Sequence, residues 1–158
     1  MALIAPPDFL VERSTVTTAS PQTVYPLIDD FHRWVDWSPW EDVDPDLKRT
    51  YSGPDAGVGA SYAWKGNRKA GAGSMTITES VPGERVVLDL VFTKPFAAKN
   101  VTTFQLEPAD GGTRVRWQMR GTRNLFLRLF GTVISMDKLV GKDFEKGLAQ
   151  LAARAERA

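Results

Sequence analysis

The sequence predicts an α+β fold in which an antiparallel sheet packs against a long C-terminal helix. Strand-like segments follow one another from 47 to 121, separated by short glycine- and proline-bearing breaks of hairpin length. Helical periodicity flanks this run, once after a first strand at 9–18 and again beyond 124. Consecutive hairpins make antiparallel neighbours, so we expect the helices to cover one face of the sheet.

Composition is that of an ordinary globular protein. The chain has 158 residues, 42% of them hydrophobic and 25% charged, with a formal net charge of +1. This length supports a single domain over 1–158, and the small charge gives no expectation of nucleic-acid binding. Cysteine is absent, and no stretch is long and apolar enough for a membrane span. We therefore expect a cytoplasmic protein without disulfides and without integral membrane association.

A helix is expected directly after the first strand. Ser20 followed by Pro21 is typical of a helix start, because serine caps the first turn and proline fits its first position. The next stretch, FHRWVDWSPW at 31–40, holds three of the five tryptophans and the only histidine, His32. Trp34 and Trp37 can share one face of a second short helix that ends before Pro39. They either close one end of the sheet or contact a ligand.

Alternation within the strands predicts which side chains face the helix. Aromatic, methionine and branched side chains dominate this inward set. We take them, with tryptophans of the 31–40 stretch and residues of the C-terminal helical stripe, as candidates for lining a cavity: Trp37, Trp40, Tyr62, Trp64, Met75, Ile77, Leu88, Leu90, Phe92, Phe104, Leu106, Val115, Trp117, Met119, Met136, Val140 and Phe144. Such side chains line either a core or a ligand pocket.

Few residues suggest catalysis. Glu79 shares the predicted inward face with Met75 and Ile77, so Glu79 and Tyr62 are the acid/base candidates, with Arg68 and Asn100 near strand ends. A single histidine and no cysteine exclude the common metal sites, and we expect no metal and no cofactor. The acidic run at 41–46 lacks the glycine and glutamate of a calcium loop, so we interpret it as a solvated turn.

Two features of the C-terminal third have alternative interpretations. The run LFLRLFGTVI at 125–134 is apolar nearly all round, and could form a lid, a docking surface or a membrane-surface contact. Gly141 and Gly147 interrupt the expected helix at a cost of about 1 kcal/mol each against alanine. Their missing side chains serve either close packing on the sheet or room for a ligand.

Several stretches together resemble a known family. SPQTVYPLIDDFHRWVDWSPWEDVDP, YAWKG, SMTITESVPGERV, GGTRVRWQMRG and MDKLVGKDFEKGLAQL are similar to the polyketide cyclase/dehydrase family of the START-like (SRPBCC, birch-pollen-allergen-like) superfamily. The resemblance covers a core at 9–157. It implies a helix-grip fold, in which a curved seven-stranded antiparallel sheet surrounds a long C-terminal helix, with two short helices after the first strand.

The resemblance also implies a function. Such proteins hold a deep apolar cavity between sheet and helix, so we expect binding of a small hydrophobic molecule that is lipid-, sterol- or polyketide-like. Two alternatives remain open: a polyketide aromatase/cyclase or dehydratase that uses acid/base groups in the cavity, and a protein-interaction module. The expected partner is a small hydrophobic ligand, and a homodimer remains open as an assembly.

Overall fold

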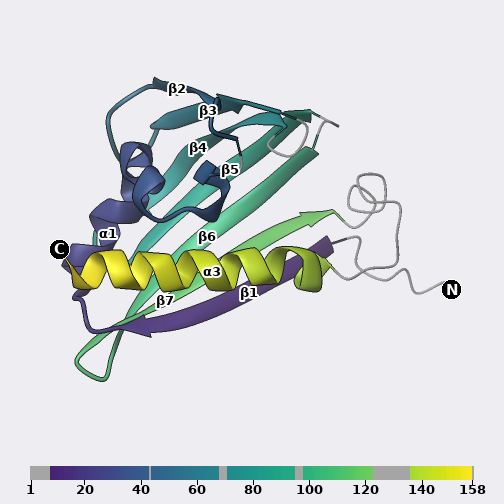
Figure 1. Ribbon diagram of the computed structural model, residues 1–158. Helices are drawn as coiled ribbons and strands as arrows, with labels where there is room; N and C mark the ends of the chain where they lie inside the picture. The colour runs from purple at the N-terminus through teal and green to yellow at the C-terminus, as the bar shows by residue number, and fades with distance from the viewer. Residues whose placement is uncertain (1–7, 43, 68–70, 95–97, 123–135, 158) are drawn as a thin grey trace, which may run out of the picture.

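The chain folds into a curved seven-stranded antiparallel sheet with a long helix across its concave face (Figure 1). The computed structural model describes residues 8–42, 44–67, 71–94, 98–122 and 136–157, with side chains except at 8–9, 42, 98, 122 and 136–140. In chain order the elements are β1 (Asp8–Thr17), α1 (Pro21–Asp29), the 3₁₀ helices η1 (Phe31–Asp36) and η2 (Pro39–Asp42), β2 (Lys48–Ser52), β3 (Ser61–Lys65), β4 (Ala72–Val81), β5 (Arg85–Lys94), β6 (Ala98–Ala109), β7 (Gly112–Thr122) and α3 (Met136–Glu156).

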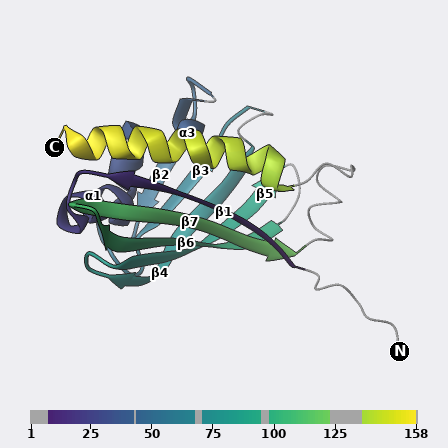
Figure 2. The same cartoon turned by 90° about the horizontal axis from the view of Figure 1, so that it is seen from below.

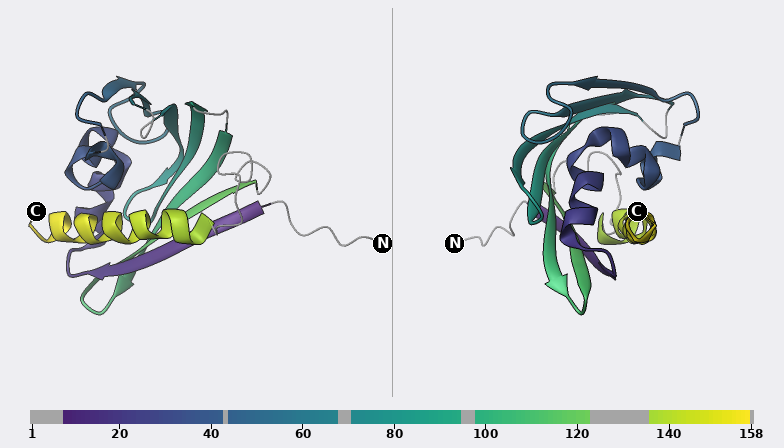
Figure 3. Two further views of the ribbon diagram at one scale, coloured as in Figure 1. Left: turned by 45° about the vertical axis from the view of Figure 1, so that its right-hand side comes forward. Right: turned by 90° about the vertical axis from the view of Figure 1, so that its left-hand side faces the viewer.

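The sheet has the order β1-β7-β6-β5-β4-β3-β2, and every neighbouring pair is antiparallel. α3 runs along β1 and β7, as the view from below shows (Figure 2). The short helices α1, η1 and η2 occupy one end of the concave side, and the sheet curves around them and α3 (Figure 3). This arrangement confirms the predicted α+β helix-grip fold.

The short helices are held by hydrogen bonds that their sequence supplies. The Ser20 side chain accepts a hydrogen bond from the backbone N–H of Thr23 at 3.3 Å, which confirms the predicted cap. The indole N–H groups of Trp34 and Trp37 donate to the carbonyl oxygens of Ile28 and Leu27, both at 2.8 Å. These carbonyl groups belong to the last turn of α1, where the C=O groups have no N–H partner within the helix. The two tryptophans therefore fix η1 against α1.

Inward side chains follow the predicted alternation in four strands. Tyr62 in β3 and Leu88 in β5 are buried, as are alternate residues of β6 and β7. Outward residues such as Val101 in β6 are exposed. The helices described here include none that is both long and apolar enough to cross a bilayer.

Both glycines inside α3 lie where a side chain would meet the sheet. A Cβ atom on Gly147 would lie 2.8 Å from Cζ3 of Trp117 and 3.0 Å from Cδ of Pro39. A Cβ atom on Gly141 would lie 2.3 Å from Nη2 of Arg13. Close packing therefore explains the missing side chain at Gly147, whereas the neighbour of Gly141 is the end of a flexible side chain.

We expect the two glycines to respond oppositely to alanine. Gly147→Ala should lower the free energy of unfolding by about 1–3 kcal/mol, because the Trp117 ring is buried and cannot move aside. Gly141→Ala should be neutral or stabilising by up to about 1 kcal/mol, since the Arg13 guanidinium is the far end of a flexible side chain and alanine favours the helix. Urea denaturation measures both, and equal losses would contradict this account.

Candidate ligand-binding groove

Aromatic side chains fill the concave face next to the short helices. Trp117 lies between Phe104 and Phe144, with ring centroids at 4.9 and 4.1 Å. The rings of Trp37 and Trp40 meet the Trp117 ring nearly at right angles, both at 5.6 Å. All of these except Trp40 are at most 2% exposed. This aromatic block fills one end of the concave face and fixes α3 to the sheet.

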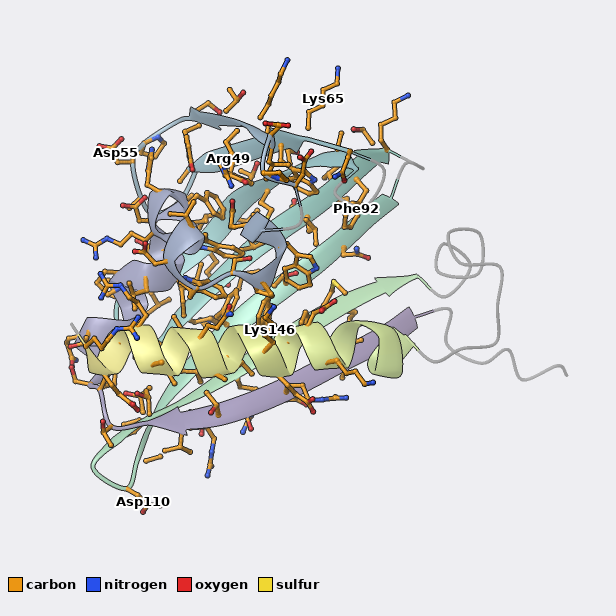
Figure 4. All side chains as sticks on the ribbon, viewed as in Figure 1. Arg49, Asp55, Lys65, Phe92, Asp110 and Lys146 are labelled. Carbon is orange, nitrogen blue, oxygen red and sulfur yellow. The ribbon has the colours of Figure 1, made fainter. Side chains whose placement is uncertain are left out.

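The other end of the concave face is apolar but only partly covered. We call it the open end and define it by Trp64, Gly73, Met75, Leu90, Phe92 and Asn100. Trp64, Leu90 and Phe92 are half-buried although their strand positions face inward. Figure 4 shows Phe92 at the end of the sheet away from α1. Apolar side chains on a concave, partly open face are typical of small-molecule sites.

The floor of the open end depends on Gly73. Across the sheet, Gly73 lies between Trp64 in β3 and Phe92 in β5. A Cβ atom on Gly73 would lie 2.3 Å from the carbonyl oxygen of Val91 and 2.7 Å from Cη2 of Trp64, so glycine lets both β5 and this indole approach β4. There the Trp64 ring meets the edge of Phe92 with centroids 5.7 Å apart. The result is an aromatic surface of two nearly perpendicular rings next to Leu90.

Two buried polar atoms on this face lack partners. Oδ1 of Asn100 and Nε1 of Trp117 make no hydrogen bond within the described part of the chain, although both residues are more than nine-tenths buried. Trp117 lies inside the aromatic block, whereas Asn100 lies beside Leu90 in the open end. An unpaired buried polar group costs about 1–3 kcal/mol, so such atoms are rare, and a bound water or ligand is the usual source of the missing partner.

A hydrogen-bonded cluster of polar side chains joins η2 to the sheet. The Glu41 carboxylate accepts hydrogen bonds from Nε of Arg49 at 2.6 Å and from the hydroxyl of Tyr62 at 3.0 Å. Nη2 of Arg49 also donates to the Glu41 carbonyl oxygen at 3.1 Å; Arg49 is labelled in Figure 4. Burial raises the pKa of Tyr62, and the negative charge of Glu41 raises it further. The Tyr62 hydroxyl is therefore held protonated and donates to Glu41.

The predicted lining residues separate into several groups. Some lie in the closed core and are at most 3% exposed: Trp37, Tyr62, Ile77, Leu88, Phe104, Leu106, Val115, Trp117 and Phe144. Others belong to the open end: Trp64, Met75, Leu90 and Phe92. Trp40 packs on the aromatic block at the closed end, and Met119 is buried beside Thr102. The side chains of Met136, Val140 and Arg68, and the segment 125–134, lie outside the described residues.

The predicted inward orientation of Glu79 is wrong. The β4–β5 register shifts between Ile77 and Glu79, so Glu79 pairs with the outward Val87. Its side chain is 49% exposed, and its Oε1 accepts from Nη2 of Arg85 at 2.6 Å. A bulge adds one residue to a strand and therefore reverses the faces beyond it.

The acidic run is less solvated than its composition suggests. Glu41 and Asp44 are 7% and 8% exposed, and the Asp44 carboxylate accepts from the backbone N–H groups of Asp46 and Asn67. His32 stacks on Tyr51 with ring centroids 4.1 Å apart and contacts Asp30 at 2.7 Å. Among the described residues, no group of three metal-ligating side chains comes together.

A separate shallow pocket lies where η1 meets the end of α3. Val35, Ser38, Gln150 and Arg157 are among the residues that line it. Its lining is mainly polar and belongs to the outside of the molecule, so it is separate from the open end.

The curved sheet and the long helix across its apolar concave face define a helix-grip protein of the SRPBCC type. The chain matches the model of the family described as polyketide cyclase / dehydrase and lipid transport over residues 8–156. It therefore belongs to that family. Comparison with curated proteins finds no match.

Solved structures share the fold at low sequence identity. Protein CV1439 from Chromobacterium violaceum is 21% identical, with a TM-score of 0.67 over 93% of this chain and 96% of its own. The Aha1 dimer from Colwellia psychrerythraea is 16% identical, with a TM-score of 0.58 over 94% of both chains. DynU16, from the dynemicin biosynthetic locus, is 14% identical, with a TM-score of 0.63 over 93% of this chain and 47% of its own. At these identities the similarity establishes the fold alone.

Proposed function

We propose that this protein binds a small hydrophobic molecule at the open end of its groove. The observation that carries this proposal is the set of half-buried Trp64, Leu90 and Phe92 on a concave face. Covering such surface gains about 25 cal/mol per Å² of apolar area removed from water. The family description, which includes lipid transport, is consistent with a ligand of this kind.

The described residues support binding better than turnover. A cyclase or dehydratase would need an acid or base that reaches the groove. Of the two candidates from the sequence, Glu79 lies on the outside and the Tyr62 hydroxyl donates to Glu41. An interaction module would instead need an exposed apolar surface, and its candidate segment at 125–134 lies outside the described residues.

Native mass spectrometry of freshly purified protein tests the proposal. We expect a stoichiometric adduct that leaves on denaturation and extracts into organic solvent. Leu90→Trp should remove the adduct, because the larger indole fills the open end. The matched control is Val101→Trp, which adds an indole to the exposed outer face of β6 and should retain the adduct. Retention in Leu90→Trp, or the absence of any adduct together with failure of apolar probes to bind, would contradict the proposal.

A further inference from the structure

We infer that the ligand is an apolar molecule carrying a hydroxyl group, which donates a hydrogen bond to Oδ1 of Asn100. This inference rests on the proposed function and adds the chemistry of the ligand. Asn100 is 6% exposed, and its Oδ1 has no partner among the described residues. A carbonyl oxygen buried in this way accepts from a donor that arrives with the ligand.

The position of Asn100 in the sheet supports the assignment. One row of inward residues crosses five strands and consists of Tyr51, Tyr62, Met75, Leu90 and Asn100. It carries two hydroxyl groups. That of Tyr62 already donates to Glu41, and Tyr51 stacks on His32 in the edge strand β2, three strands from Leu90. The carboxamide is therefore the polar group beside Leu90 that remains for a ligand.

The neighbouring row explains why an apolar body is expected next to the hydroxyl. Trp64, Gly73 and Phe92 form the aromatic floor, two residues along the strands from the Asn100 row. Strand spacing and rise place the Cα atoms of Asn100 and Phe92 about 8 Å apart. A ring system lying on Phe92 and Leu90 can thus place a hydroxyl group at Asn100. A purely hydrocarbon ligand would cover the floor and leave Oδ1 unpaired.

Thr102 is the natural comparison for Asn100. It is the next inward residue of β6 and is 4% exposed. It lies in the following row, between Leu88 and Met119, and so farther from the aromatic floor. If any buried polar side chain of β6 affected ligand binding, substitution of either residue would change the affinity. The inference predicts such a change for Asn100 alone.

Three fluorescent probes that differ at one position test the inference: 2-naphthol, 2-methoxynaphthalene and naphthalene. The full chain should bind 2-naphthol about 10-fold more tightly than 2-methoxynaphthalene, as one neutral hydrogen bond implies. Asn100→Leu should abolish this preference while retaining the naphthalene affinity. Comparing ratios between proteins cancels the different hydrophobicities of the probes. Thr102→Val, the matched control, should keep the preference.

The outcomes separate this inference from the proposed function. Binding of all three probes without preference would leave the function standing and overturn the role of Asn100. Persistence of the preference in Asn100→Leu would also overturn the role of Asn100. Failure of every probe to bind would overturn both that role and the proposed function. If Asn100→Leu does not fold, NMR of the side-chain amide of Asn100 in the wild-type protein tests the inference instead. The resonances of this amide should shift with 2-naphthol more than with naphthalene, and equal shifts would count against the inference.

Discussion

Trp117→Ala is expected to lower the free energy of unfolding by about 3–5 kcal/mol, the upper range for a single core truncation. The Trp117 ring stacks on Phe144 with planes 7° apart and centroids 4.1 Å apart, and on Phe104 from the other side. It also meets the rings of Trp37 and Trp40. Truncation would leave a cavity where α3, the sheet and the short helices meet, so no single element could move to fill it.

Urea denaturation followed by far-ultraviolet circular dichroism measures this loss without relying on tryptophan fluorescence. Val101→Ala is the control, because Val101 lies on the outer face of the adjacent strand and is 42% exposed. Its loss should stay below about 1 kcal/mol. Similar losses in the two variants would show that the aromatic block does not hold the helix to the sheet.

Strand alternation predicted much of the concave face because β5, β6 and β7 keep a regular pleat. In these strands every second residue faces inward, as Leu88, Phe104 and Trp117 show. The helix stripe was equally accessible to prediction at Phe144, because a periodic apolar face must lie against something. These predictions depend only on local geometry, which the sequence pattern expresses directly.

Prediction failed where the outcome depends on distant partners. The bulge in β4 reversed the orientation of Glu79, although the segment TITES contains no glycine to indicate it. Gly73 lies in β4 beneath the Trp64 ring, a contact that only the folded neighbouring strand reveals. Burial of Glu41 follows from Arg49 and Tyr62, which are supplied by other strands. The composition of the acidic run does not predict which of its carboxylates hydrogen-bond to residues distant in the sequence.

The open end was only partly predictable for the same reason. Alternation identified Leu90 and Phe92 as inward, and Asn100 was noted as a polar residue near a strand end. Which inward residues remain half-buried depends on how far α1, η1 and η2 extend over the sheet. That extent is a property of the packed structure.

Glu41→Gln should lower the free energy of unfolding by about 2–3 kcal/mol, because the carboxylate is buried and accepts charge-assisted hydrogen bonds from two side chains. The loss stays below that of a fully buried ion pair because the Arg49 side chain is 29% exposed, so water can solvate its charge. Glutamine keeps the shape and one acceptor oxygen. Urea denaturation near neutral pH measures the difference.

Glu79→Gln is a closely matched control for this variant. Both pairs join a glutamate to an arginine with an N–O distance of 2.6 Å, so they differ in burial and not in length. The Glu79 side chain is 49% exposed and that of Glu41 is 5% exposed. Exposed pairs contribute about 0–1 kcal/mol, so Glu79→Gln should have a small effect. Equal losses in the two variants would mean that burial does not determine the strength of these pairs.

The pKa of Tyr62 gives a second, independent measure of the Glu41 cluster. Burial raises this pKa first, and the charge of Glu41 and its hydrogen bond raise it further. The unfolded tyrosine therefore loses its proton before the folded one does, and stability falls as the pH rises above the ordinary tyrosine value. In Glu41→Gln the pKa of Tyr62 should fall yet remain raised, because its burial is unchanged. Tyrosinate absorbance, corrected with Tyr62→Phe for the other two tyrosines, measures the shift, and an unchanged titration would separate Tyr62 from Glu41.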